Sequence, residues 1–545
     1  MRKLSKLKLS AILFIFLLLS GINITAAAIE NPGHQQVNEE ETLEFTVTAP
    51  ANVRVFIKNK PPGAVWNEAN RKFSFTPDFI QGGKSWDVIL EAPEISSTVQ
   101  FTVTVNDTIS PPVPVIDSTE ALWQATLYRL KYTTDTYLDP PGLAGRVIEA
   151  NVVVPNSASA SQKYPLLIKL HGYDPNPATP IVGNGLLFGI ATTDPGNTWW
   201  TGYSDTLPLP QGQAVTGGTV KNYSQRRVMH LLSYVINHFS GVDLDNINIE
   251  GSSMGAVGGI MISSKFARHF NIIQGNVGSV ALSRLNAGQV QDHAKRYFGA
   301  RNLNLLDENG DNAWDVYDAN AVALTNRDFR DLFFYQEYGQ NDKLVPFKGV
   351  AQRSDLTNKS FSETLQDEGI GHLIAWDQRD HSTGEPAPYL YDWWFPLATM
   401  TADIDAYLGQ LRRNRPFPAF SNSTADSEIE YYDTFGNIIH SGALRGVINR
   451  YFRWDGKATT EDRSHVAIPI RVLVTQDGSP SHDPDFPVLG NEYFGPLPVT
   501  TDVTIRRLTQ FQLLPNETVN WTYGGQSGTA QANPDSSVTI RQLAV

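Results

Sequence analysis

The chain has 545 residues, of which 41% are hydrophobic and 18% charged, and 43 Lys and Arg against 56 Asp and Glu give a formal net charge of −13. This length suits about three domains of ordinary size, and the composition is too apolar and aromatic for a disordered chain. The acidic balance argues against a nucleic-acid partner, because few basic groups could neutralise phosphates. The absence of cysteine rules out a disulfide and a thiol nucleophile.

The first 28 residues have the pattern of a secretory signal peptide. Four basic residues lie within 1–8, an apolar stretch covers 11–24, and three alanines at 26–28 offer a cleavage site. A membrane anchor is the alternative, but a spanning helix needs about 20 apolar residues. We expect export and cleavage, with no stable membrane span afterwards. Because a large exported protein without disulfides is typical of bacteria, the expected location is secreted or periplasmic.

Residues 29–107 alternate between apolar and polar side chains in the manner of strands. Phe101, Val103 and Val105 illustrate the spacing of two, and turn residues such as those at 61–63 separate the apolar segments. This pattern predicts a small β-sandwich. Further along, Ser-Pro-Pro-Val-Pro at 110–114 predicts a short stiff linker.

Three stretches of this first segment carry a resemblance to a known kind of module. They are 31–33 (Asn-Pro-Gly), 61–64 (Pro-Pro-Gly-Ala) and 73–78 (Phe-Ser-Phe-Thr-Pro-Asp). The segment resembles the immunoglobulin- or cadherin-like modules that bacteria append to secreted enzymes. The resemblance implies a spacer or a binding accessory rather than a catalyst.

From residue 118 to 412 the pattern changes to alternating strands and helices. An apolar run at 166–170 predicts a buried strand, 224–239 carries one apolar helical stripe, and a further strand at 247–250 leads directly into a helix rich in small residues. Such alternation predicts an α/β fold with a largely parallel, doubly wound sheet. After Pro416 short β-branched runs return, which predicts a C-terminal β-domain over 416–545.

The strongest chemical signal is Gly251-x-Ser253-x-Gly255, which lies between the strand at 247–250 and the helix that follows. A nucleophilic serine on a sharp strand-to-helix turn needs small neighbours so that the backbone can pass closely. The turn also places the serine at a helix N-terminus, where backbone N–H groups stabilise negative charge. A plain Gly-Ser turn is the alternative, but the surrounding elements favour a nucleophile at Ser253.

A serine nucleophile of this architecture needs an acid and then a base later in the chain. Asp342 follows an apolar strand in a loop that ends in Val-Pro, and we expect it to be the acid, although a turn-capping Asp is the common alternative. Two histidines flank the next strand: His372 precedes it and His381 follows it. Because catalytic groups of open α/β sheets gather at the carboxyl ends of strands, we expect His381 to be the base.

An oxyanion hole needs two backbone donors. The first expected donor is the N–H of Met254, the residue after the nucleophile. The second is expected in the loop after the strand at 166–170, where His171-Gly172-Tyr173 lies, and we assign it to the N–H of Tyr173. A simple tight turn at His171-Gly172 is the alternative.

Residues 118–412 resemble the α/β-hydrolase superfamily and are most similar to its secreted bacterial esterases and its prolyl-oligopeptidase-like hydrolases. The resemblance rests on His171-Gly172, on the pentapeptide 251–255, on Asp342 with Val345-Pro346, and on His381. It implies acyl transfer without a cofactor, in which Ser253 attacks an acyl carbonyl, His381 relays the proton and water releases the acid. No metal-binding pair of the HExxH kind is present among the histidines.

Three functions fit this resemblance. Export and accessory β-modules favour an enzyme that hydrolyses carboxylic esters of an extracellular polymer or its fragments. The first alternative is a serine peptidase of the prolyl-oligopeptidase type without a propeller, because the segment before residue 118 is too short for propeller blades. The second is a binding protein whose α/β domain has lost its chemistry.

Two further patterns carry weaker expectations. Asp and Asn residues between Asp307 and Asp318 follow part of a calcium-loop spacing, but the glycine of that motif is replaced by Asn312, so a solvated acidic insertion is favoured over a calcium site. Trp199 and Trp200 lie in a Gly/Asn/Thr-rich loop. They form either an aromatic platform for substrate or the core of the loop.

Overall fold

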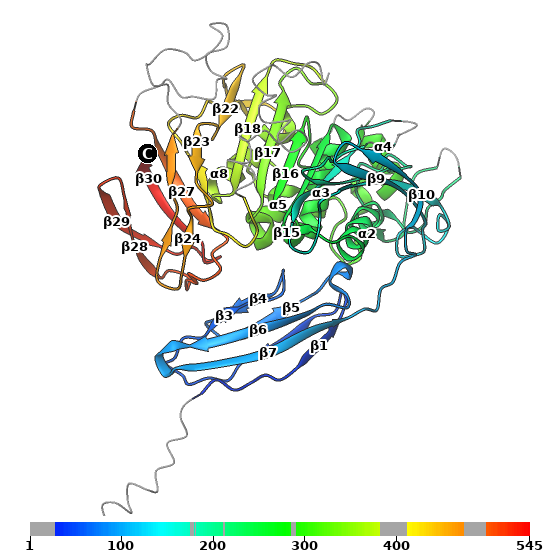
Figure 1. Cartoon of the computed structure of the whole chain (residues 1–545). Coiled ribbons are helices and arrows are strands. Elements are labelled where there is room, and N and C mark those ends of the chain that lie inside the picture. Colours follow the sequence, from blue (N-terminus) through cyan, green and yellow to red (C-terminus); the bar gives the residue numbers. More distant parts are fainter. Residues whose placement is uncertain are drawn as a thin grey trace, which may run out of the picture. The chain divides into compact units, whose positions relative to one another are not determined.

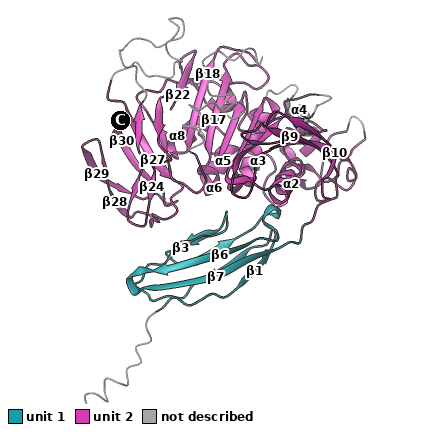
Figure 2. Ribbon diagram, in the orientation of Figure 1, with its two compact units in different colours: residues 1–109 teal, residues 110–545 magenta. Residues whose placement is uncertain are grey.

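The structure is a computed structural model that describes residues 28–174, 179, 181–210, 213–284, 290–381, 411–472 and 497–545. The predicted signal peptide therefore lies, apart from residue 28, outside the described residues. The chain divides into two compact units, 1–109 and 110–545 (Figure 2). Among the described residues no helix is both long and apolar enough to cross a membrane.

The first unit consists of two sheets that share one core. One sheet has the order β1–β7–β6–β3 and the other β2–β5–β4, counted over 28–109, all of which is described. Their bounds are β1 Gln35–Asn38, β2 Leu43–Thr46, β3 Phe56–Lys58, β4 Val65–Asn67, β5 Lys72–Phe75, β6 Ser85–Ala92 and β7 Ser97–Asn106. Phe73 from one sheet and Val88 and Val103 from the other are buried in the same cluster. The alternation read from the sequence thus buries one face of each strand.

Within the described residues, the second unit is built on a ten-stranded sheet (Figure 1). Six neighbouring strands of it, from β12 to β18, run parallel. Strands β10, β9 and β8 extend one edge in antiparallel fashion, and β22 does so at the other. In order across the sheet the strands are β22 Gly446–Ile448, β18 Gly371–Asp377, β17 Phe333–Gly339, β16 Ile272–Asn276, β15 Val242–Ser252, β11 Tyr164–Leu170, β12 Phe188–Thr192, β10 Val147–Pro155, β9 Ala125–Thr133 and β8 Val115–Leu122.

The sheet is therefore mixed rather than largely parallel as expected, and its doubly wound arrangement stays a prediction. The central strands are buried on both faces, and every residue of β17 is buried, which explains their near-continuous apolar runs. The longer helices of this unit are α2 Tyr223–His238, α3 Met254–Phe266 and α4 Val290–Phe298, and the shorter ones include α5 Ala319–Thr325, α7 Lys348–Ala351 and α8 Phe361–Asp367.

The boundary expected near 412–416 does not coincide with a break in the structure. Strand β22 pairs with β18, so the C-terminal segment supplies an edge strand of the large sheet. Phe417 and Val503 are buried in the same cluster as Phe333 and Leu373 of that sheet. The remaining C-terminal strands include a second sheet made of β19 Phe417–Ser421, β27 Thr500–Arg506 and β30 Val538–Ala544. Because the two sheets share one core, the C-terminal segment is part of the second unit.

Candidate active site

Ser253 lies on the turn between β15 and α3, in a strained backbone conformation with φ 55° and ψ −121°. A Cβ added to Gly251 would lie 2.2 Å from the carbonyl carbon of Gly255, and one added to Gly255 would lie 2.3 Å from the Leu170 oxygen. Both distances are too short for real atoms, so the glycines are required by the close approach of three backbone segments. Strain of this kind, held by its surroundings, is typical of functional sites.

Three predicted side chains form one hydrogen-bonded chain. Ser253 Oγ lies 2.8 Å from His381 Nε2, and His381 Nδ1 lies 2.7 Å from Asp342 Oδ2. The Asp342 side chain is buried, and its Oδ1 accepts hydrogen bonds from the N–H groups of Leu344 (2.8 Å) and Val345 (2.9 Å). His381 keeps 23% of its side chain exposed, and Ser253 is half-buried. An ionised Asp342 would hold the Nδ1–H tautomer and leave Nε2 to accept the serine proton.

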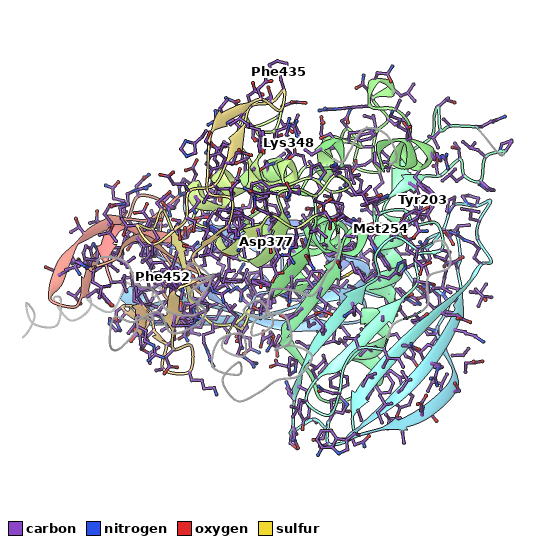
Figure 3. All side chains as sticks on the ribbon, turned by 90° about the horizontal axis from the view of Figure 1, so that it is seen from above. Tyr203, Met254, Lys348, Asp377, Phe435 and Phe452 are labelled. Carbon is purple, nitrogen blue, oxygen red and sulfur yellow. The ribbon has the colours of Figure 1, made fainter. Side chains whose placement is uncertain are left out.

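The acid and the base are brought together by two neighbouring strands. Strands β17 and β18 are parallel, with Gly339 paired to Asp377 at their carboxyl ends. Beyond these ends the loops are joined, because Gln340 N–H donates to Asp377 O at 2.8 Å and Asn341 N–H donates to Arg379 O at 3.1 Å. Figure 3 labels Asp377 at the end of β18 and Met254 at the start of α3. The loops therefore hold Asp342 and His381 side by side.

His372, the alternative base, is not part of this chain. It lies near the start of β18, where it is buried; Nδ1–H donates to Ile370 O at 2.7 Å and Nε2 accepts from Asn449 Nδ2 at 3.1 Å. Burial lowers the pKa of His372 to about 4. It is a neutral core histidine, as its place at a strand entry predicts.

Replacing His372 with Gln is expected to change how stability depends on pH. The unfolded chain protonates this histidine below about pH 6.5, whereas the folded protein does so only near pH 4. As the pH falls from 6.5 to 4, the native protein therefore loses on the order of 3 kcal/mol of unfolding free energy relative to His372→Gln. Urea unfolding of both proteins at about pH 7 and about pH 4.5 measures this difference.

The buried Asp426 also makes the stability of both proteins depend on pH. Burial raises its pKa to about 7, so its contribution is lost as the pH rises through 7, the opposite sign to that of His372. Both proteins contain Asp426, so its effect cancels in their difference. A stability difference that stays constant between the two pH values would contradict the buried neutral state of His372.

The two expected oxyanion donors lie at the nucleophile turn and beside it. Met254 is the first residue of α3, so its N–H has no acceptor within the helix. Tyr173 follows β11 by three residues and exposes its ring. A Cβ added to the intervening Gly172 would lie 3.8 Å from Ser253 Cβ, which places this loop directly against the serine. The donor roles of Met254 and Tyr173 stay predictions.

The tryptophan pair does not form an exposed platform. Trp199 is 5% exposed and Trp200 1% exposed. Trp200 Nε1–H donates to His171 O at 3.2 Å, and a Cβ on Gly258 would lie 2.5 Å from the indole. The indole of Trp200 thus packs between α3 and the His171 loop, which favours the loop-core alternative, and a substrate contact of Trp199 or Trp200 stays a prediction. The need for glycine at position 258 could not be predicted from the sequence, because it arises from the position of an indole that is distant along the chain.

A buried ionic network behind the His171 loop was also missed. Asp194 N–H donates to His171 Nε2 at 2.8 Å, and Asp194 Oδ2 accepts from Thr198 N–H at 2.6 Å. Arg227 of α2, which is buried, lies 3.3 Å from Asp194 Oδ1. Asp194 therefore fixes both the His171 loop and the tryptophan loop. A lone Asp after a strand gives no local signal of this role.

The acidic segment 307–318 uses its carboxylates for ion pairs and caps. Asp307 lies 2.9 Å from Lys265 Nζ and accepts from the N–H of Asn309 and Asp311. Asp318 caps α5 by accepting from Asn320 N–H at 2.9 Å. Across the part of the chain that the structure describes, no group of three His, Cys, Asp or Glu could hold a metal ion. Asp307 and Asp318 are buried, so at these two positions the segment is not the solvated insertion expected from the sequence, and the choice between insertion and calcium loop stays a prediction.

The chain matches no protein-family model and no curated protein. Among solved structures it is similar to an S-formylglutathione hydrolase from Agrobacterium tumefaciens, at 15% identity and a TM-score of 0.32 over 49% of this chain and 92% of that one. It is also similar to a fluorophosphonate-binding serine hydrolase from Staphylococcus aureus, at 15% identity and a TM-score of 0.32 over 47% of this chain and 92% of that one. A third similar structure is a ferulic acid esterase from Anaeromyces mucronatus, at 12% identity and a TM-score of 0.27 over 51% of this chain and 88% of that one.

These neighbours are serine hydrolases and esterases by name. In the second unit Ser253 lies on the turn after β15, near the middle of the mixed sheet, Asp342 lies in the loop after β17 and His381 in the loop after β18. No chemistry is transferred from the neighbours, and the function proposed below rests on the contacts among Ser253, His381 and Asp342.

Proposed function

We propose that this protein is a serine hydrolase that cleaves carboxylic esters through a covalent acyl-enzyme. The observation that carries the proposal is the continuous chain from Ser253 Oγ through His381 to the buried Asp342 carboxylate, with spacings of 2.8 and 2.7 Å. These are the distances at which a general base removes the proton of a nucleophilic hydroxyl.

The proposed reaction has two halves. Ser253 Oγ attacks the ester carbonyl while its proton passes to His381 Nε2, and the N–H groups of Met254 and Tyr173 stabilise the resulting oxyanion. When the tetrahedral intermediate collapses, the C–O bond to the alcohol breaks and His381 gives its proton to that oxygen. Water then attacks the acyl-enzyme by the same route, releasing the acid and restoring Ser253. The Asp342 carboxyl group holds His381 through its contact with Nδ1 in both halves.

The proposed substrates are esters of an extracellular polymer or its fragments, and the protein is proposed to be exported to the periplasm or beyond. The basic and apolar stretches before residue 28 support export. A separate β-unit over 1–109, followed by the proline-rich stretch 110–114, supports an accessory module that holds the enzyme near a large substrate.

A fluorophosphonate probe tests the nucleophile without any assumption about the substrate. We expect the native protein to react at one site, and peptide mapping to place the adduct on Ser253, while heat-denatured protein does not react. A panel of 4-nitrophenyl esters, methyl esters of aromatic acids and prolyl or aminoacyl amides then separates the functions. Hydrolysis of amides without esters would favour the peptidase, and no labelling at all would favour a binding protein.

A further inference from the structure

An ion pair joins β17 to the loop that carries the proposed base, with its carboxylate buried and its guanidinium largely buried. Glu337, near the carboxyl end of β17, is 1% exposed, and its Oε2 lies 3.2 Å from Arg379 Nη2. The Tyr335 hydroxyl donates to Glu337 Oε1. Burial raises the pKa of Glu337, and the guanidinium groups of Arg379 and Arg450 with the Tyr335 hydroxyl oppose that shift. Neither member of the pair has a hydrogen bond to Ser253, His381 or Asp342 among the contacts of the described residues.

Arg379 is held at several points of the base and acid loops. Its N–H donates to Asp377 Oδ1 at 2.9 Å, and its carbonyl accepts from Asn341 N–H at 3.1 Å. A Cβ added to Gly339 would lie 2.9 Å from Arg379 Cγ and 2.4 Å from Arg379 O, so the arginine backbone and stem rest directly on the end of β17. His381 follows only two residues later. Any movement of Arg379 is therefore passed to the imidazole through two peptide units.

We propose that the Glu337–Arg379 ion pair positions His381 so that its Nε2 can accept the proton of Ser253. The inference rests on the serine hydrolase function proposed above and adds to it a pair of positioning residues. Arg379 Nε also lies 3.2 Å from Asp377 Oδ1, so the guanidinium links Glu337 of β17 to Asp377 of β18. Without Glu337 the guanidinium keeps only Asp377 and is displaced from β17, and without Arg379 the buried Glu337 carboxylate loses its cation. Such a displacement of Arg379 would carry the loop 377–381 with it. A shift of about 1 Å at a catalytic group costs on the order of 100-fold in rate.

The test compares Glu337→Gln, Arg379→Met and Arg379→Lys with the native protein, using a short 4-nitrophenyl ester. In the first two variants we expect kcat to fall by about 10- to 100-fold with KM within about twofold, because the substrate pocket is untouched while the base is displaced. Arg379→Lys should recover part of the loss, since it keeps the charge but not the planar fork. The double variant Glu337→Gln/Arg379→Met should be no worse than either single one, because the two residues act as one unit.

Asp243→Asn is the matched control. Asp243 pairs with Arg412 at 2.8 Å and is nearly buried, but it lies at the amino end of β15, the opposite end of the sheet from the triad. This variant should lower the thermal midpoint and leave kcat unchanged. If Glu337→Gln does not fold, Arg379→Lys and Arg379→Met carry the comparison.

The outcomes separate this proposal from the one it rests on. A native protein that neither reacts with the fluorophosphonate nor hydrolyses esters would overturn the serine hydrolase function. An active native protein whose folded Glu337 and Arg379 variants keep their kcat would overturn the positioning role alone. Equal losses of kcat in the Asp243→Asn control would also overturn it, since loss of any buried pair would then suffice.

Discussion

Ester hydrolysis by the Ser253→Ala variant is expected to fall by about 10⁴- to 10⁶-fold in kcat, with the fold unchanged. The substitution removes only the hydroxyl group. This group is the proposed nucleophile, and it lies 2.8 Å from His381 Nε2, so the proposed acyl-enzyme cannot form without it. Alanine keeps the Cβ that the strained turn already accommodates, so we expect no change in thermal stability beyond about 1 kcal/mol. Steady-state kinetics with a chromogenic ester and circular dichroism measure the two properties.

Ser252→Ala is the matched control for this experiment. Ser252 precedes the nucleophile, and its hydroxyl is buried without a hydrogen-bond partner among the described residues. Its removal should leave kcat within about twofold of the native value, because neither the proton path nor the oxyanion donors include it. Should Ser253→Ala retain the native rate, or Ser252→Ala lose it, the nucleophile would have been assigned to the wrong residue.

Gly255→Ala is expected to lower the free energy of unfolding by about 3 kcal/mol and to reduce ester hydrolysis together with it. The added methyl group would lie 2.3 Å from Leu170 O and 3.0 Å from His171 O, so either α3 or the loop after β11 must move away. That loop carries Gly172, which lies against Ser253, and the adjacent Tyr173. Urea unfolding and fluorophosphonate labelling rates measure the two losses.

Gly259→Ala, one turn further along the same helix, separates this steric effect from a general effect of alanine. Its added methyl group would meet only Ile273 and Ile249 side chains, at 3.6 and 3.7 Å, which are ordinary contacts. Because alanine is favoured over glycine in a helix by about 1 kcal/mol, this variant should be as stable as the native protein or more so. Equal destabilisation by both substitutions would rule out the close approach of Gly255 to β11 as the cause.

The position of the nucleophile turn could be predicted because its signal is local. Two glycines flanking a serine between a strand and a helix permit the close backbone approach that such a sharp turn requires, and the turn is found where the spacing indicates it. The choice of His381 over His372 needed only the direction of one strand, since groups at opposite ends of a strand lie far apart. The structure brings His381, and not His372, to Ser253.

Features that depend on distant partners could not be predicted. The apolar surface of Trp200 fits a substrate site and a loop core equally well, and only the bare backbone at Gly258 decides for the core. Strand β22 is three residues long and carries no period that would link it to β18. The Glu337–Arg379 pair joins two strands whose register is not encoded in either segment alone.

The shared core of β18, β19 and β27 has a consequence for shortened forms of the chain. A protein that stops near residue 415 would lose β22, leaving the backbone N–H and C=O groups along the outer edge of β18 uncovered. It would also expose Phe333 and Leu373, which are buried in the same cluster as Phe417 and Val503. Such a truncation should aggregate rather than yield a smaller enzyme, although Ser253, Asp342 and His381 would all still be present in its sequence.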